Sequence, residues 1–122
     1  MSTTDPTSTP GPLGTADLIA AYIAVWNERD AAARETLMGT VLTDDCFYSD
    51  PDHAGLHGHA ELSQAIGLAH TKLGDLRFTL GSLIGVHHDR ALFTWQLGTV
   101  ATGYDVVDFD GDRIRSVVGF FV

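Results

Sequence analysis

The residues best suited to chemistry lie in one short stretch, Cys46 to His59, whose centre is the pair Asp50-Pro51. Proline restricts the residue before it to extended geometry, so the sequence predicts that Asp50 closes a strand with its backbone in the β region. A carboxylate held where a strand meets a loop is a candidate general base. An Asp-Pro pair also forms turns in which the carboxylate has only a structural role. Both interpretations are open from this stretch alone.

The loop after this pair is rich in polar side chains: Asp52, His53, His57 and His59 follow Asp50 within ten residues. Carboxylate and imidazole groups at such spacing are ligands for zinc or non-haem iron. The same composition is typical of a polar entrance to a pocket. We expect the second arrangement, with no metal and with His53 and His57 beside the ligand.

Tyr22 and Asp105 are two further candidates, because each polar group falls on an apolar face. Tyr22 lies on the apolar stripe of a predicted helix, so its hydroxyl either reaches a backbone carbonyl or donates within a pocket. Asp105 alternates with Val107 and Phe109 on the inward face of a predicted strand. Burial there raises the pKa of the Asp105 carboxyl, and a neutral acid can donate to an oxyanion. The alternative is a hydrated Asp105 where the sheet opens.

Three helices are predicted in the first part of the chain, from apolar residues at helical spacing. The first begins at a Thr15 cap, the second at an Asp30 cap, and the third runs from about His59 to Gly74. A strand over residues 46–50 and a loop separate the last two helices. After Gly74 the pattern becomes extended and rich in β-branched and aromatic residues. The strand candidates are Leu76–Val86, Ala91–Thr99, Tyr104–Asp110 and Arg113–Val122.

Successive hairpins join these strands, with Asp110-Gly111-Asp112 as the strongest turn signal. Strands joined in this way form an antiparallel meander, and the three helices must cover one face of it. The fold class is therefore α+β.

Length and charge exclude several classes of protein. The 122 residues suffice for one domain, expected over residues 15–122 after a proline-rich flexible tail at residues 1–14. The net charge of −9 argues against partners that are nucleic acids or anionic membranes. Cys46 is the only cysteine, so no internal disulfide can form. No secretory signal or membrane span is evident, and we expect a cytoplasmic location.

The order and spacing of these motifs over residues 16–122 resemble the nuclear transport factor 2-like superfamily. Within it, the chain is most similar to ketosteroid isomerases and SnoaL-like polyketide cyclases. The resemblance rests on a helix with Tyr22-Ile23 at its centre, a strand ending in Asp50-Pro51, a glycine-led helix and a meander closing on residues 110–114. It implies a cone-shaped, curved, mostly antiparallel sheet covered by three N-terminal helices.

The resemblance also implies roles for three residues. Asp50, in Ser49-Asp50-Pro51, matches the base of the isomerases, and Tyr22 matches their oxyanion-hole tyrosine. Asp105 matches the protonated aspartate that completes the oxyanion hole. In SnoaL-like cyclases an aspartate near position 105 is the acid/base, so the roles of Asp50 and Asp105 can be exchanged. Epoxide hydrolases of the superfamily carry an arginine at the position of Gly103.

We therefore expect a cofactor-free enzyme that moves a proton next to a carbonyl, in an isomerisation or an aldol-type cyclisation of a hydrophobic ring substrate. The expected apolar pocket wall is Trp26, Phe47, Trp95, Val107 and Phe109. The alternatives are a non-catalytic ligand-binding or dimerisation module of the same fold, and an epoxide hydrolase. A homodimer is expected through the outer sheet face: Leu92, Thr94, Gln96, Tyr104 and Val106.

Overall fold

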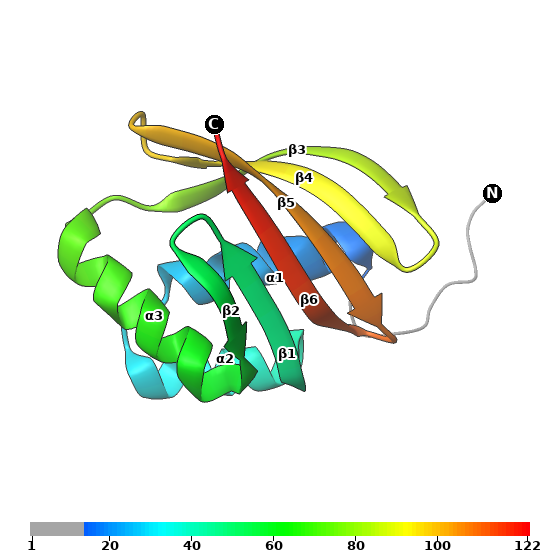
Figure 1. Cartoon of the computed structure of the whole chain (residues 1–122), viewed down its shortest axis with the longest axis horizontal. Coiled ribbons are helices and arrows are strands. Elements are labelled where there is room, and N and C mark those ends of the chain that lie inside the picture. Colours follow the sequence, from blue (N-terminus) through cyan, green and yellow to red (C-terminus); the bar gives the residue numbers. More distant parts are fainter. Residues whose placement is uncertain (1–13) are drawn as a thin grey trace.

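The computed structural model describes residues 14–122, so the expected tail lies outside the described residues except for Gly14. The described chain forms a curved sheet with helices against one side (Figure 1). The elements are α1 (Thr15–Asn27), α2 (Ala31–Val41), β1 (Leu42–Asp50), β2 (His53–His57), α3 (Gly58–Leu73), β3 (Phe78–His87), β4 (Arg90–Leu97), β5 (Ala101–Asp110) and β6 (Arg113–Phe121). The predicted α+β class is confirmed.

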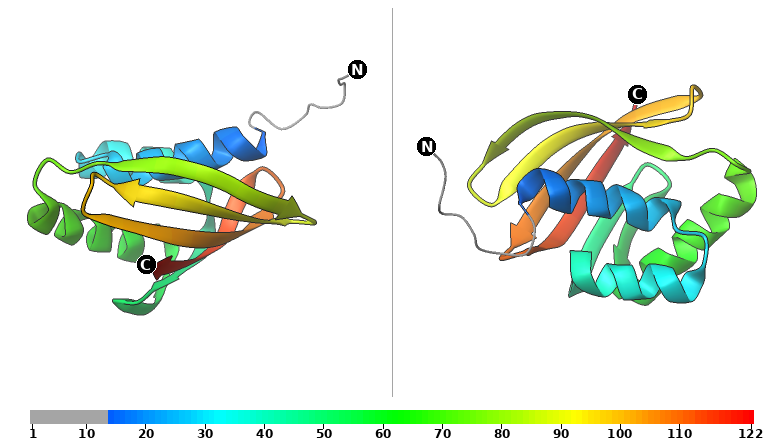
Figure 2. Two further views of the ribbon diagram at one scale, coloured as in Figure 1. Left: turned by 90° about the horizontal axis from the view of Figure 1, so that it is seen from above. Right: turned by 180° about the vertical axis from the view of Figure 1, so that it is seen from behind.

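The sheet has six strands in the order β2-β1-β6-β5-β4-β3. Neighbours from β3 to β6 pair antiparallel, which confirms the predicted meander. β1 pairs antiparallel with β2 but parallel with β6, so the first and last strands of the chain lie side by side. Figure 2 shows the twist of the long strands and α1 lying across the inner face of the sheet.

Two local predictions are wrong. Residues 53–57 form the edge strand β2, where a loop is expected, because their backbone pairs with β1 through Phe47↔His57 and Tyr48↔Leu56. Glycine and histidine have little β propensity, so the cross-strand backbone bonds, invisible in local sequence, decide this strand. The N-cap of α1 is Gly14, whose carbonyl accepts from the Leu18 amide at 2.8 Å, and Thr15 is the first helical residue.

The other two helix signals are confirmed. Asp30 Oδ2 accepts from the Ala33 amide at 2.8 Å and caps α2, a contact that stabilises a helix by about 1 kcal/mol. Gly74 follows α3 with φ of 61°, a left-handed conformation that glycine adopts without strain.

Val41 passes directly into β1 with no connecting loop. None of the described helices is long and apolar enough to cross a membrane.

Side-chain hydrogen bonds fasten the helices to one another and to the sheet. Asn27, at the end of α1, makes two bonds of 2.8 Å with the backbone of Phe78 in β3. Arg34 of α2 is buried, and its guanidinium donates to the side chain and carbonyl of Ser63 in α3 and to the carbonyl of Glu28. These bonds satisfy buried polar groups and set the distance between the helices and the sheet.

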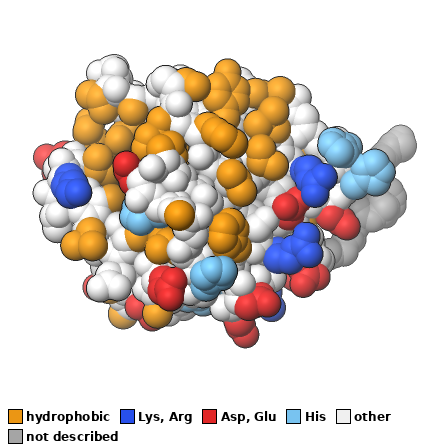
Figure 3. Space-filling view, in the orientation of Figure 1, with side chains coloured by type: hydrophobic (Ala, Val, Ile, Leu, Met, Phe, Trp, Pro, Cys, Tyr) orange, Lys and Arg blue, Asp and Glu red, His pale blue; other side chains and the backbone are white. Residues whose placement is uncertain are grey.

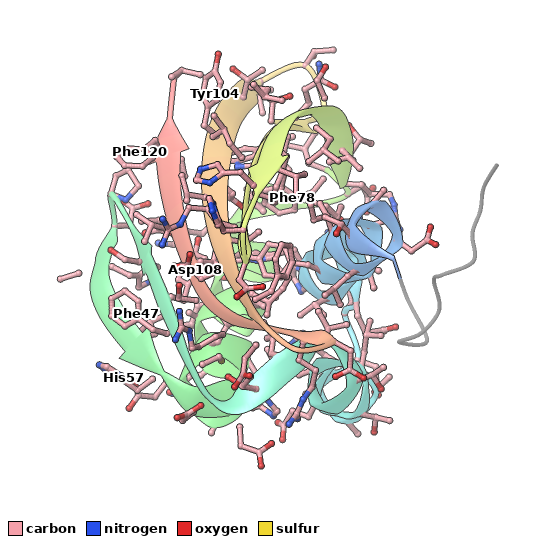
Figure 4. All side chains as sticks on the ribbon, turned by 90° about the vertical axis from the view of Figure 1, so that its right-hand side faces the viewer. Phe47, His57, Phe78, Tyr104, Asp108 and Phe120 are labelled. Carbon is pink, nitrogen blue, oxygen red and sulfur yellow. The ribbon has the colours of Figure 1, made fainter. Side chains whose placement is uncertain are left out.

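The outer face of the sheet carries exposed apolar side chains. Figure 3 shows hydrophobic side chains gathered on the face of the molecule where Figure 1 places β3 to β6. Tyr104 and Phe120 face one another across β5 and β6 on this side (Figure 4), with 38% and 53% of their surface exposed. Val106 and Val118 are the next such pair. Contiguous apolar surface of this kind is typical of a protein interface.

We propose that this face joins two copies of the chain in a two-fold dimer. Light scattering at micromolar concentration should then give the dimer mass. Phe120→Glu and Tyr104→Glu would each place a charge in the interface and should weaken association by at least about 2 kcal/mol. Leu68→Glu, on α3 away from this face, should leave the mass unchanged. A monomer mass for the wild-type chain would contradict the proposal.

Candidate functional site

A cavity of about 580 Å³ lies between the sheet and helices α1 and α3. Aromatic and aliphatic side chains form most of its wall. Trp26 and Phe78 meet with ring centroids 5.5 Å apart, and Phe78 meets Trp95 at the same distance. The polar residues of the wall are Tyr22, Tyr48, Asp50, Asp52, His53, Lys72 and Asp105. An apolar cavity with a few convergent polar groups is the usual form of a small-molecule site.

Helix α1 contributes Tyr22 and Trp26, one turn apart on its buried face. The Trp26 indole N–H donates to the Tyr22 hydroxyl oxygen at 2.8 Å. A hydroxyl has one proton and two lone pairs, so this bond leaves the Tyr22 proton free to be donated. Burial, and then the nearby Asp105 carboxyl, raise the pKa of Tyr22 well above its ordinary value. Tyr22 is therefore a neutral donor at any physiological pH.

Strands β4 and β5 supply a second candidate donor, Asp105, which also accepts a hydrogen bond from an indole. The Trp95 indole N–H donates to Asp105 Oδ1 at 3.1 Å. Trp95 lies directly over Gly103, where a Cβ atom would stand 2.1 Å from the indole ring. Burial, opposed by the bond from Trp95 and reinforced by Asp50, raises the pKa of Asp105 to about 7. The Asp105 carboxyl is thus largely protonated below neutral pH, and its second oxygen can donate.

The aspartate at the end of β1, Asp50, has different hydrogen-bond partners from Asp105. Asp50 Oδ2 accepts from the Tyr48 hydroxyl at 2.6 Å, while Oδ1 accepts from the Asp52 amide at 2.8 Å. The Nδ1 atom of His53 lies 3.0 Å from the same Oδ1. Only 5% of the Asp50 side chain is exposed. The Tyr48 hydroxyl and the Asp52 amide are donors, so these two bonds suit a carboxylate that accepts.

Gly119 of β6 lies beside both Asp105 and Asp50. A Cβ atom there would stand 2.7 Å from Asp105 Oδ1 and 3.7 Å from Asp50 Cβ. The lack of a side chain therefore opens the space in which the acid of β5 and the acid of β1 approach one another. The cavity brings together all three expected catalytic residues, Tyr22, Asp50 and Asp105, as well as Trp26, His53 and Trp95.

Four residues expected in the pocket lie elsewhere in the described structure. Phe47 and His57, both labelled in Figure 4, pack on each other at 5.3 Å between ring centroids. They lie on the side of β1 and β2 opposite the buried Tyr48. Strand alternation sends residue 47 outward when residues 46 and 48 are buried. Val107 and Phe109 share the inward face with Asp105 but lie farther along β5, outside the cavity wall, with Val107 in the closed core.

Tyr48 is the most important residue that the sequence analysis misses. Its ring lies 5.5 Å from that of Trp26, and its hydroxyl holds Asp50. Burial above all raises the pKa of Tyr48, so its hydroxyl stays protonated and donates. A period of two counted back from Asp50 would have placed it on the same face. Phe78, Phe121 and Lys72 also line the cavity, and only tertiary packing brings them there.

The three histidines of residues 53–59 lie in different environments and do not form one site. His59 Nε2 lies 3.2 Å and 3.0 Å from the carbonyls of Leu42 and Thr43, so it serves as a structural donor. His57 packs on Phe47, and His53 alone of the three lines the cavity. Within residues 14–122 no three potential ligands gather into a group that could hold a metal ion.

The family profile of the SnoaL-like domain matches residues 19–117, which is most of the chain. The chain therefore belongs to the SnoaL-like family, and its fold is that of the nuclear transport factor 2-like superfamily. A comparison with curated proteins found no match.

Solved structures agree with this family. A protein from Agrobacterium tumefaciens, provisionally named an isomerase of the SnoaL-like family, is 32% identical, with a TM-score of 0.78 over 86% of this chain and 94% of that one. A protein from Kribbella flavida, provisionally named a ketosteroid isomerase, is 16% identical, with a TM-score of 0.66 over 86% and 75%. A ketosteroid isomerase-like fold from Catenulispora acidiphila, solved with trimethylamine, is 14% identical, with a TM-score of 0.70 over 90% and 85%.

The raised pKa of Asp105 predicts a pH dependence of stability. The folded protein keeps this proton up to about pH 7, whereas the unfolded chain releases it near the ordinary value of 3.8. Between these values the folded state binds more protons, so stability must fall as pH rises. From pH 5 to pH 8 the unfolding free energy should fall by roughly 2–3 kcal/mol more in the wild-type protein than in Asp105→Asn.

Urea unfolding of both proteins across this pH range measures the difference, and other titrating groups cancel in the comparison. Parallel curves for the two proteins would show that Asp105 is ionised in the folded state at neutral pH.

Proposed function

We propose that the protein is an enzyme that transfers a proton next to a carbonyl of a hydrophobic ring compound, by isomerisation or by aldol-type cyclisation. One observation carries the proposal: a single cavity holds two carboxyl groups in contrasting surroundings. Asp50 accepts hydrogen bonds from the Tyr48 hydroxyl and the Asp52 amide and lies 3.0 Å from His53 Nδ1, whereas burial raises the pKa of Asp105 to about 7. Two acids in such different surroundings can divide into base and acid roles.

The donors suit a developing enolate. Tyr22 and Asp105 each accept from an indole and keep an O–H for the ligand, so both can bind one carbonyl oxygen. Hydrogen bonds to that oxygen strengthen as negative charge develops on it, which lowers the barrier to loss of a proton from the neighbouring carbon. The Asp50 end of the cavity supplies the negative charge of the base.

The walls indicate the substrate class. Trp26, Phe78 and Trp95 contribute aromatic surface to the cavity wall, which suits an apolar ring. An epoxide hydrolase fits less well, because a side chain at Gly103 would collide with Trp95 and no arginine is among the described residues that line the cavity. Names given to members of the family, isomerase and polyketide cyclase, agree with carbonyl chemistry.

Phenols test the oxyanion site without knowledge of the substrate. A bound phenolate places its charge where the enolate oxygen would lie, so the two donors should lower the pKa of a bound naphthol or fluorescent phenol. Tyr22→Phe and Asp105→Asn should each weaken phenolate binding by roughly 1–3 kcal/mol. Asp50→Asn removes a neighbouring negative charge and should instead tighten it.

Tyr104→Phe is the matched control, because it removes a tyrosine hydroxyl on the outer face of the sheet. Fluorescence titration of each variant against pH measures both affinity and the pKa of the bound phenol. If phenols bind with their pKa unchanged, the donors do not form an oxyanion site, and the protein is better described as a ligand-binding module.

A further inference from the structure

Asp50 is in contact with a histidine that the proposed function has not used. We propose that His53 and Asp50 form a catalytic dyad, in which Nε2 of His53 takes the proton from the carbon next to the carbonyl and Asp50 holds the imidazole through Nδ1. This inference rests on the proposed function and names the atom that acts as base at the Asp50 end of the cavity.

The contact between the two side chains determines which nitrogen is available. His53 Nδ1 lies 3.0 Å from Asp50 Oδ1. An ionised carboxylate can only accept, so Nδ1 must carry the hydrogen of this bond. In the neutral imidazole Nε2 then has a lone pair and no proton. His53 lines the cavity, and Nε2 is its ring nitrogen without a partner among the described residues.

The surroundings of Asp50 favour a supporting role for the carboxylate. Its Oδ1 accepts from both His53 and the Asp52 amide, and its Oδ2 accepts from Tyr48 at 2.6 Å. Three of its lone pairs are thus occupied by donors, and only 5% of the side chain is exposed. An anion so placed stabilises a neighbouring imidazolium, as an orienting carboxylate does in other histidine-based sites.

The backbone fixes the imidazole relative to the carboxylate. Asp50 and His53 face one another across β1 and β2, joined by the reversal at Pro51 and Asp52. The Ser49 hydroxyl donates to the His53 carbonyl at 3.3 Å. The side chain of His53 is 36% exposed at the edge of the cavity, whereas that of Asp50 is enclosed. The proton taken by His53 would therefore be in contact with solvent.

The proton balance is complete without a cofactor. Nε2 of His53 takes the proton, and the electron pair of the C–H bond passes into the enolate, whose oxygen is bound by Tyr22 and Asp105. The imidazolium, paired with the Asp50 carboxylate, then returns a proton from Nε2 to another carbon of the conjugated enolate. His53 ends neutral, with its hydrogen on Nδ1 as at the start.

A small cyclic ketone tests the dyad. Conversion of 3-cyclohexenone to 2-cyclohexenone by the full chain in D₂O would be followed by ultraviolet absorbance and by NMR of the product. Because the imidazolium N–H exchanges with solvent, the wild-type product should carry deuterium at the γ-carbon. His53→Ala should lower kcat by about 10²–10⁴-fold, and added imidazole should restore part of it. Asp50→Asn should lower kcat as well, and imidazole should not rescue it.

His87→Ala is the control, since His87 is an exposed histidine at the end of β3. It should keep wild-type turnover and deuterium content. If His53→Ala keeps the wild-type rate, or if the wild-type product retains protium, Asp50 itself is the base and the dyad is wrong. If the wild-type protein leaves the ketone unchanged while phenols still show a lowered pKa, the base is wrong but the oxyanion site stands.

Nitrogen NMR tests the dyad without any substrate. At neutral pH the ¹⁵N shifts of the His53 ring should report hydrogen on Nδ1 in the wild-type protein, and Asp50→Asn should shift the ring toward the Nε2–H form. A wild-type His53 with hydrogen on Nε2 alone would overturn the proposal, because Nε2 could not then accept a proton.

Discussion

The parallel pairing of β1 with β6 is the constraint on which the site depends. It joins the strand that follows α2 to the last strand of the meander, with Ser49 opposite Val118. On its other side β6 pairs with β5, with Gly119 opposite Asp105. The two acids, 55 positions apart in the numbering, thereby stand on either side of one glycine. Any side chain at position 119 would occupy the space between them.

The two acids differ because their neighbours differ. Asp105 accepts one hydrogen bond, from an indole, and burial above all raises the pKa of its carboxyl to about 7. Asp50 instead has a phenol, a backbone amide and an imidazole within hydrogen-bond distance. A low dielectric makes each of these hydrogen bonds more consequential than it would be in water. The division of roles follows from packing, since the two side chains are chemically identical.

The cavity stays open because its frame is held by polar contacts outside it. Interiors pack densely, and an unfilled space forfeits contacts that would stabilise the fold. Asn27 fastens α1 to β3, Arg34 fastens α2 to α3, and His70 Nε2 lies 2.7 Å from the Trp26 carbonyl. These bonds hold the helices at a fixed separation from the sheet. The edge-to-face aromatic contacts of Trp26, Phe78 and Trp95 make the wall rigid as well.

The family relationship narrows the chemistry without choosing a substrate. One fold supports many reactions, so function has to be argued from the groups in the cavity. The indole-supported donors Tyr22 and Asp105 favour a substrate with a carbonyl oxygen. His53 is partly exposed and Asp50 is enclosed, so a base at His53 would exchange protons with water and a base at Asp50 would not.

Local sequence was sufficient for the fold class, for the caps at Asp30 and Gly74, and for Tyr22, Asp50 and Asp105 as the residues to watch, the last three with the help of the family resemblance. Periodicity reports which face of an element is buried, and proline and glycine restrict the backbone where they stand. Both signals depend on a few neighbouring residues, so they can be read without knowing how the rest of the chain packs.

The tertiary structure alone decided which polar groups meet. Residues 53–57 have little strand propensity, but they form β2 because their backbone hydrogen-bonds with that of β1. That pairing turns His53 toward Asp50 and sends Phe47 and His57 to the opposite side. Tyr48 acquires its role from contacts with Asp50 and Trp26, which belong to different elements. Register between strands and the choice of inward face depend on long-range hydrogen bonds and packing, and no window of local sequence contains those partners.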